Sequence, residues 1–229
     1  MTKVRTLIGR FTLLVSVAVL IGSSVQLSTI VPAMADPDAA MQSSAEVGKK
    51  APSFSLTDTN GKTHKLADYK GKFVVLEWFN EGCPFVKKHY NSKNMQNLQK
   101  EYVGKGVVWL TINSSAPGKQ GNHTPEEYNK VEKDWGAEPT AFLIDTDGKV
   151  GHLYGAKTTP DMYVIDKKGM LVYSGAIDDT PGTDASEIPQ AKNYVKTALD
   201  EAMAGKEVKL ASTRSYGCSV KYDKLTASH

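Results

Sequence analysis

The residue of this chain best suited to nucleophilic chemistry is Cys83. It follows an apolar run at residues 73–76 that is typical of a buried strand. Pro84, directly after it, favours the first turn of a helix, because its missing N–H has no partner to lose there. The positive end of a helix dipole, together with Lys87 and Lys88 one turn later, favours the thiolate, which is the reactive form. We therefore expect Cys83 to open a helix and to be reactive; the alternative is an inert buried cysteine.

Cys218 is the only other cysteine, and it lies in a Ser-Tyr-Gly-Cys-Ser segment near the C-terminus. An even number of cysteines in an exported protein indicates a disulfide. Three readings stay open. Cys218 folds back as a redox-active partner of Cys83, it forms a permanent disulfide worth roughly 5 kcal/mol in the chain-entropy model, or it is unpaired. We favour redox-active pairing.

Glu77 is the candidate proton shuttle. It lies six positions before Cys83 and directly after the apolar run, which favours a buried carboxylate over an exposed one that merely ends the strand. A buried carboxylate has a raised pKa and can exchange protons near neutral pH. Trp78 is expected in the core, where it would at most shield the site. Asn80 is a candidate hydrogen-bond donor to a thiolate or a peroxide.

The surrounding pattern predicts an α/β fold. Short strands at residues 51–56 and 63–66, separated by an Asp-Thr-Asn-Gly turn, predict an N-terminal β-hairpin extension. Further strands are expected at residues 107–112, 140–144, 162–165 and 171–173. Helices are expected at residues 83–102 with a break near 91–92, from residue 124 with a capping box, and at residues 187–203. Strands separated by helices and followed by a hairpin predict a mixed β-sheet flanked by helices.

The spacing of Glu77, Trp78 and Cys83 resembles the thioredoxin superfamily, in which a buried acid precedes an aromatic pair and the nucleophilic cysteine. The Ala-Pro-x-Phe-x-Leu, Asn-Gly-Lys and Leu-x-Asp-Tyr-x-Gly-Lys segments between residues 51 and 72 are similar to the redoxin branch. That branch holds the alkyl hydroperoxide reductase/thiol-specific antioxidant proteins and the exported thioredoxins of cytochrome maturation. The resemblance covers residues 48–205 and implies a thioredoxin-like fold.

The resemblance also implies roles for individual residues. Pro160, which follows Thr159 and cannot lie inside a central strand, matches a cis-proline that faces the nucleophile. Thiol–disulfide exchange through Cys83 is implied, with protein thiols or disulfides or a small thiol reductant as partners. The family's second cysteine is replaced by Val86, so any internal resolving thiol must be Cys218.

Two other functions remain as alternatives. A thiol-dependent peroxidase, a peroxiredoxin-like antioxidant, is disfavoured because Leu76 and Asn80 replace the Pro and Thr/Ser of the peroxidase signature, and only Arg214 remains after residue 35. The second alternative is a non-catalytic, partner-binding domain that has lost the second cysteine of the family. We expect no metal and no other cofactor. His89, His123 and His152 are expected to be surface or structural residues.

The N-terminus resembles a secretory signal, with a basic start, an apolar run at residues 11–21 and a small-residue site at 33–35. We expect a signal peptide at 1–35, a linker at 36–47, the redoxin domain at 48–210 and a tail carrying Cys218 at 211–229. Export to the periplasm or outside the cell follows; the alternative is a membrane anchor formed by an uncleaved segment. The net charge of +3 resides in residues 1–35, so nucleic acid is not an expected partner.

Overall fold

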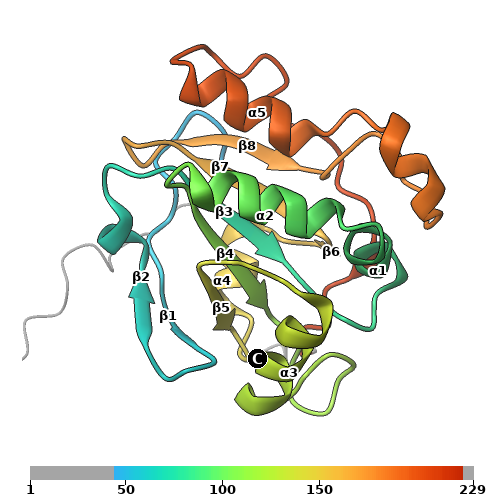
Figure 1. Cartoon of the computed structure of the whole chain (residues 1–229). Helices are drawn as coiled ribbons and strands as arrows, with labels where there is room; N and C mark the ends of the chain where they lie inside the picture. Colours follow the sequence, from blue (N-terminus) through green and yellow to red (C-terminus); the bar gives the residue numbers. More distant parts are fainter. Residues whose placement is uncertain (1–43, 224–229) are drawn as a thin grey trace, which may run out of the picture. The chain divides into compact units, whose positions relative to one another are not determined.

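The computed structural model describes residues 44–223, so the predicted signal peptide and most of the predicted linker lie outside the described residues. A seven-stranded sheet has the order β2-β1-β5-β4-β3-β7-β8 (Figure 1). Its strands are β1 Ser55–Asp58, β2 Thr63–Lys65, β3 Val74–Trp78, β4 Val108–Asn113, β5 Ala141–Ile144, β7 Asp161–Ile165 and β8 Leu171–Gly175. β3, β4 and β5 are parallel, whereas β7 pairs antiparallel with β3. The predicted mixed sheet and N-terminal hairpin are confirmed.

Helices cover both faces of this sheet (Figure 1). They are α1 Pro84–Asn91, α2 Asn94–Gly104, α3 Pro125–Trp135, α4 Lys149–Tyr154 and α5 Tyr194–Met203, with 3-10 turns η2 Leu66–Tyr69 and η3 Ala185–Gln190. Successive side chains of β3 alternate between two apolar clusters. Val75 packs in the cluster shared with α1, α2, α3 and α5, and Leu76 packs in the cluster shared with α4. Among the described residues, no helix is long and apolar enough to cross a membrane.

The loop after β3 sets the start of α1. Cys83 has an extended backbone and is the N-cap, and Pro84 is the first helical residue, so Cys83 precedes the helix rather than opening it. The predicted break separates α1 from α2 at Lys93, whose backbone is left-handed with φ 63°. The capping box of Thr124 and Glu127 is present at the start of α3.

Two elements differ from the prediction. α4 was not predicted; the buried Asp145 carboxylate accepts the N–H groups of Val150 and Gly151 and so holds a short helix there. The last helix begins at Tyr194, because Pro189 lies in the preceding 3-10 turn and the Asn193 side chain caps the new helix.

A second, small sheet joins the tail to the rest of the fold. β6 Thr158–Thr159 pairs antiparallel with β9 Cys218–Ser219. The Val220 N–H continues this pairing by donating to the Lys157 oxygen. The C-terminal tail therefore lies directly against the segment that leads into β7.

Candidate active site

Cys83 is fully buried at the N-terminus of α1. Its backbone N–H donates to the Asn80 oxygen at 3.0 Å, which closes the turn between β3 and the helix. The Asn80 side chain braces the same turn, accepting from the Gly82 N–H and donating to the Gln120 oxygen. Asn80 thus shapes the turn, and nothing in its contacts supports the expected bond to a thiolate or peroxide.

The segment before β7 forms the other wall of the site. The Thr159–Pro160 peptide bond is cis, which confirms that expectation. The Cys83 thiol donates to the backbone oxygen of Thr159 at 3.0 Å, so this segment lies at the sulfur. The Thr159 side chain is also buried, and its hydroxyl has no hydrogen-bond partner within residues 44–223. That hydroxyl is therefore available to donate to a Cys83 thiolate.

The tail brings Cys218 to the same residue. Cys218 is the register partner of Thr159 across β6 and β9. Gly217 makes this approach close: a Cβ there would lie 2.1 Å from the Thr159 oxygen, and its φ is +139°. Both cysteines are free thiols. Cys83 and Cys218, which are far apart in the sequence, thus meet at Thr159, where their thiols interact.

The electrostatics of the two thiols are unequal. Burial raises the pKa of the Cys83 thiol, but interactions with the Thr159 side chain, the Cys218 thiol and nearby backbone N–H groups outweigh burial and lower the pKa. Burial, together with the hydrogen bond to Cys83 and the negative charge of Cys83, raises the pKa of Cys218 to about 11. These opposite shifts favour ionisation of the Cys83 thiol over ionisation of the Cys218 thiol.

Glu77 is buried, as expected, and burial raises the pKa of its carboxyl despite four hydrogen bonds. The donors are Tyr90 Oη at 2.8 Å, Trp109 Nε1 at 2.8 Å, Gln99 Nε2 at 3.2 Å and Thr111 Oγ1 at 3.3 Å. None of these four bonds involves Cys83. The proton-shuttle role of Glu77 stays a prediction.

Trp78 lies away from this site. Adjacent residues of a strand point to opposite faces of a sheet. Trp78 packs in the cluster with α4, donates from Nε1 to Ser114 Oγ at 3.0 Å, and contacts Tyr163, whereas Cys83 packs in the other cluster. Its expected shielding of the cysteine is not seen.

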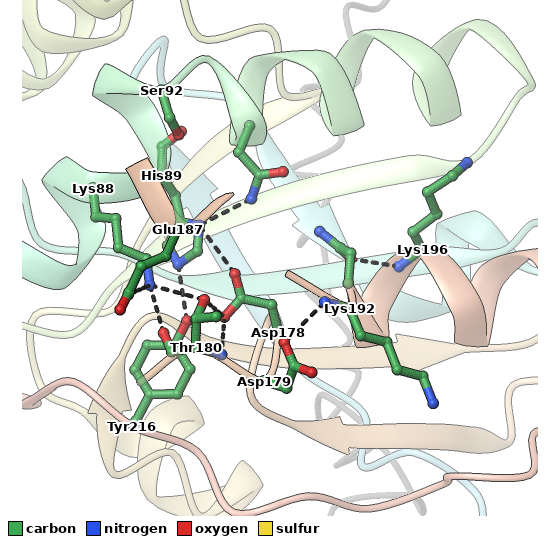
Figure 2. A network of polar contacts seen from close by, with 12 residues as sticks. Lys88, His89, Ser92, Asp178, Asp179, Thr180, Glu187, Lys192, Lys196 and Tyr216 are labelled. Atoms are coloured by element: carbon green, nitrogen blue, oxygen red, sulfur yellow. Dashed lines mark hydrogen bonds and ion pairs between the residues drawn. The ribbon is translucent and has the colours of Figure 1, made fainter. Parts of the chain in front are cut away.

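The sequence reading missed a buried polar network beside the site (Figure 2). His89, treated as an ordinary surface or structural histidine, is fully buried and bonds to Tyr216 in the tail. Lys88 is also buried, and its ammonium group is held by the Thr180 oxygen and hydroxyl rather than directed at the sulfur. The one sequence feature that could have indicated a docked tail is the pair Tyr216 and Gly217, directly before Cys218. Within residues 44–223, no three His, Cys, Asp or Glu side chains form a group that could hold a metal.

Comparisons with known proteins identify a family and named relatives of this chain. The AhpC/TSA family model matches residues 47–174. The chain is 34% identical over 118 residues to thiol-disulfide oxidoreductase ResA of Bacillus thuringiensis subsp. konkukian, covering 46% of this chain and 67% of that protein. It is 31% identical over 125 residues to the ResA of Bacillus subtilis, covering 55% of this chain and 64% of that one.

Solved structures extend the likeness to most of the chain. An uncharacterized conserved protein of Geobacillus kaustophilus superposes with a TM-score of 0.67 at 30% identity, covering 82% of this chain and 96% of that one. A hypothetical protein of Sinorhizobium meliloti gives the same TM-score at 26% identity, covering 79% of this chain and 96% of that one. The shared fold therefore covers more of the chain than the match to the ResA proteins does.

Proposed function

Because this chain belongs to the AhpC/TSA family, we propose that it is a thiol–disulfide oxidoreductase with Cys83 as nucleophile and Cys218 as resolving thiol. The relatives named thiol-disulfide oxidoreductase ResA support an oxidoreductase activity. The observation that carries the proposal is that both thiols meet at Thr159, with the pKa of Cys83 lowered and that of Cys218 raised. Protein thiols and disulfides are the proposed substrates.

The proposed cycle balances as two thiol–disulfide exchanges. The Cys83 thiolate attacks one sulfur of a substrate disulfide, and the other sulfur leaves as a thiolate and takes a proton from water. Cys218 then gives up its proton, which reaches water by way of the proposed shuttle, and attacks the Cys83 sulfur, which releases the second substrate thiolate, again protonated by water. The substrate gains two electrons, and the protein holds a Cys83–Cys218 disulfide until a thiol reductant opens it.

Glu77 is the proposed proton shuttle of this cycle. Its burial and the raised pKa of its carboxyl support that role. Since none of its hydrogen bonds reaches Cys83, the transfer would pass through intervening groups rather than by direct contact.

The test is reduction of a peptide disulfide by the purified dithiol protein, with the protein disulfide mapped by non-reducing peptide analysis. Wild type should yield one Cys83–Cys218 bond per disulfide reduced. Cys83→Ser should be inactive, and Cys218→Ser should accumulate a mixed disulfide on Cys83. Reduction at full rate by Cys83→Ser would overturn the proposal. Faster consumption of hydrogen peroxide than of disulfide would point to the peroxidase, and a Cys83 that alkylates no faster than a free cysteine would point to a partner-binding domain.

We also propose that the chain is exported and divides into a signal peptide at 1–35, a linker at 36–47, the redoxin domain at 48–210 and the tail at 211–229. The basic start and apolar run of residues 1–35 support this. The mass of the mature protein should correspond to a chain that begins at Asp36. A full-length chain found in the membrane fraction would instead favour the uncleaved anchor.

A further inference from the structure

Tyr216 of the tail lies beside Lys88 and His89 of α1, the helix that begins after Cys83 (Figure 2). Its ring packs against Phe85 at a centroid distance of 6.0 Å, and Lys88 Nζ lies 5.4 Å from its centroid. Its hydroxyl lies 3.1 Å from His89 Nε2. Phe85, Lys88 and His89 are spaced so that they share one side of α1. Tyr216, two positions before Cys218, therefore fixes the tail to the helix whose N-cap is Cys83.

The hydroxyl of Tyr216 completes a partly buried chain of hydrogen bonds in which each donor can be assigned. Burial and the charge of Lys88 outweigh the opposing charge of Asp178 and lower the pKa of His89 to about 4, so the ring is neutral at pH 7. Asn94 Nδ2 donates to His89 Nδ1 at 2.9 Å, which assigns the ring proton to Nε2. His89 then donates to Tyr216, and Tyr216 donates to Asp178 Oδ1.

If the tail were displaced, this network would offer no other side chain of the described segment to replace the Tyr216 hydroxyl at His89 and Asp178. Asp178 is buried, and its Oδ1 also accepts from the N–H and hydroxyl of Thr180, the residue that holds Lys88. Its Oδ2 has no hydrogen-bond partner among the described residues. Removing Tyr216 would leave His89 Nε2 and part of the Asp178 charge unsatisfied in a buried site, which is costly. Docking of the tail thus depends on one side chain that is polar at its tip and apolar along its ring.

We propose that Tyr216 is a positioning residue that anchors the tail on α1 and so presents Cys218 to Cys83. This proposal rests on the proposed function, in which Cys218 is the thiol that resolves Cys83. By holding β9 on β6, the anchor gives Cys218 a high effective concentration at the Cys83 sulfur. Cys83 is fully buried with the tail in place, and Tyr216 and Cys218 both pack against the apolar cluster that contains it.

The test compares Tyr216→Ala, Tyr216→Phe and the control Tyr154→Phe. The control removes a different tyrosine hydroxyl, one that donates to the Pro52 oxygen, outside the tail. The first measurement is the equilibrium of the Cys83–Cys218 disulfide with glutathione, which gives the effective concentration of Cys218. The second is the rate of Cys83 alkylation by iodoacetamide at neutral pH. Circular dichroism verifies that each variant is folded.

Tyr216→Ala should lower the effective concentration by about tenfold or more and speed alkylation of Cys83, because the tail detaches. Tyr216→Phe, which keeps the ring, should fall between Tyr216→Ala and wild type, and Tyr154→Phe should match wild type. Wild-type values in both measurements for folded Tyr216→Ala would overturn the anchor. If wild type itself forms no Cys83–Cys218 disulfide, the proposed function fails, and the alkylation rates alone then decide whether Tyr216 anchors the tail.

Discussion

The thiol of Cys83 donates a hydrogen bond to the backbone oxygen of Thr159 at 3.0 Å. The same Thr159 pairs with Cys218 across β6 and β9, so one residue beside Pro160 organises both sulfurs. This bond is available only to the thiol, because a thiolate has no proton to donate. When Cys83 ionises, it loses the bond to the Thr159 oxygen and needs hydrogen-bond donors instead. The Cys218 thiol and the Thr159 hydroxyl are the side chains that can donate to it.

Removing the Cys218 thiol should therefore raise the pKa of Cys83. We expect Cys218→Ala to shift the pH profile of Cys83 alkylation to higher pH, since the thiolate loses a donor. Cys218→Ser keeps a hydroxyl donor and should shift it less. The measurement is the alkylation rate as a function of pH. A profile of Cys218→Ala that is unchanged, or moved to lower pH, contradicts this assignment of donor and acceptor.

Gly217→Ala should detach Cys218 from its place opposite Thr159. The new Cβ would lie 2.1 Å from the Thr159 oxygen, and a φ of +139° is unfavourable for alanine. A strain of about 1–3 kcal/mol corresponds to roughly a 5- to 150-fold loss in the equilibrium for Cys83–Cys218 disulfide formation. The readout is redox titration with glutathione.

The matched control for this substitution is Gly104→Ala, near the end of α2, where an added Cβ meets nothing within 4 Å. It should leave the redox equilibrium unchanged. Equal equilibria for the two alanine variants would mean that the close approach of Gly217 to Thr159 does not control the disulfide.

Short sequence patterns predicted those parts of the site that depend only on residues close together in the chain. The apolar run before Glu77 predicted β3 and the burial of its last residues, and Pro84 predicted the start of α1. Proline's exclusion from central strands predicted that Pro160 precedes β7. Each of these depends on side chains within a few positions of one another.

The remainder depends on contacts between distant parts of the chain. β6 and β9 have two residues each, too short for any period to be visible, and their pairing is fixed by the fit of Gly217 against Thr159. The buried position of His89 follows from the tail that covers it. The last helix begins later than predicted, because a 3-10 turn that contains Pro189 precedes it and the Asn193 side chain caps its first turn.

Glu77→Gln should remove a pH dependence of stability. Burial raises the pKa of Glu77 above its unfolded value, so the folded protein keeps a proton that the unfolded chain releases. Wild type should therefore lose stability relative to Glu77→Gln as pH rises above about 4.3, by about 1.4 kcal/mol per pH unit until the folded pKa is passed. Urea unfolding at several pH values measures the difference.

Two further variants make the test of Glu77 specific. Glu207→Gln, at an exposed position, should run parallel to wild type. Glu132 also titrates in this range, because burial and then the charge of Glu77 raise its pKa to about 7. Glu132→Gln, alone and combined with Glu77→Gln, separates the two contributions. A constant difference between wild type and Glu77→Gln across the range would show that Glu77 has no raised pKa.

A substrate bonded to Cys83 should displace β9. Cys83 is fully buried while Cys218 pairs with Thr159, so a mixed disulfide needs the space that the tail occupies. In Cys218→Ser carrying glutathione on Cys83, we expect faster hydrogen exchange at the Val220 amide, which donates to the Lys157 oxygen at 3.0 Å. The reduced variant, with the tail docked, should exchange slowly at that amide.

The Leu110 amide, in the central strand β4, serves as the internal reference for this exchange experiment. Its protection should be the same with and without glutathione, because entry of the substrate moves the tail and leaves the central sheet in place. Slow exchange at Val220 in the glutathionylated protein would mean that substrate reaches Cys83 beneath a docked tail. In that case Cys218 could attack the mixed disulfide without any rearrangement, and the tail would be a fixed wall of the site rather than a movable cover.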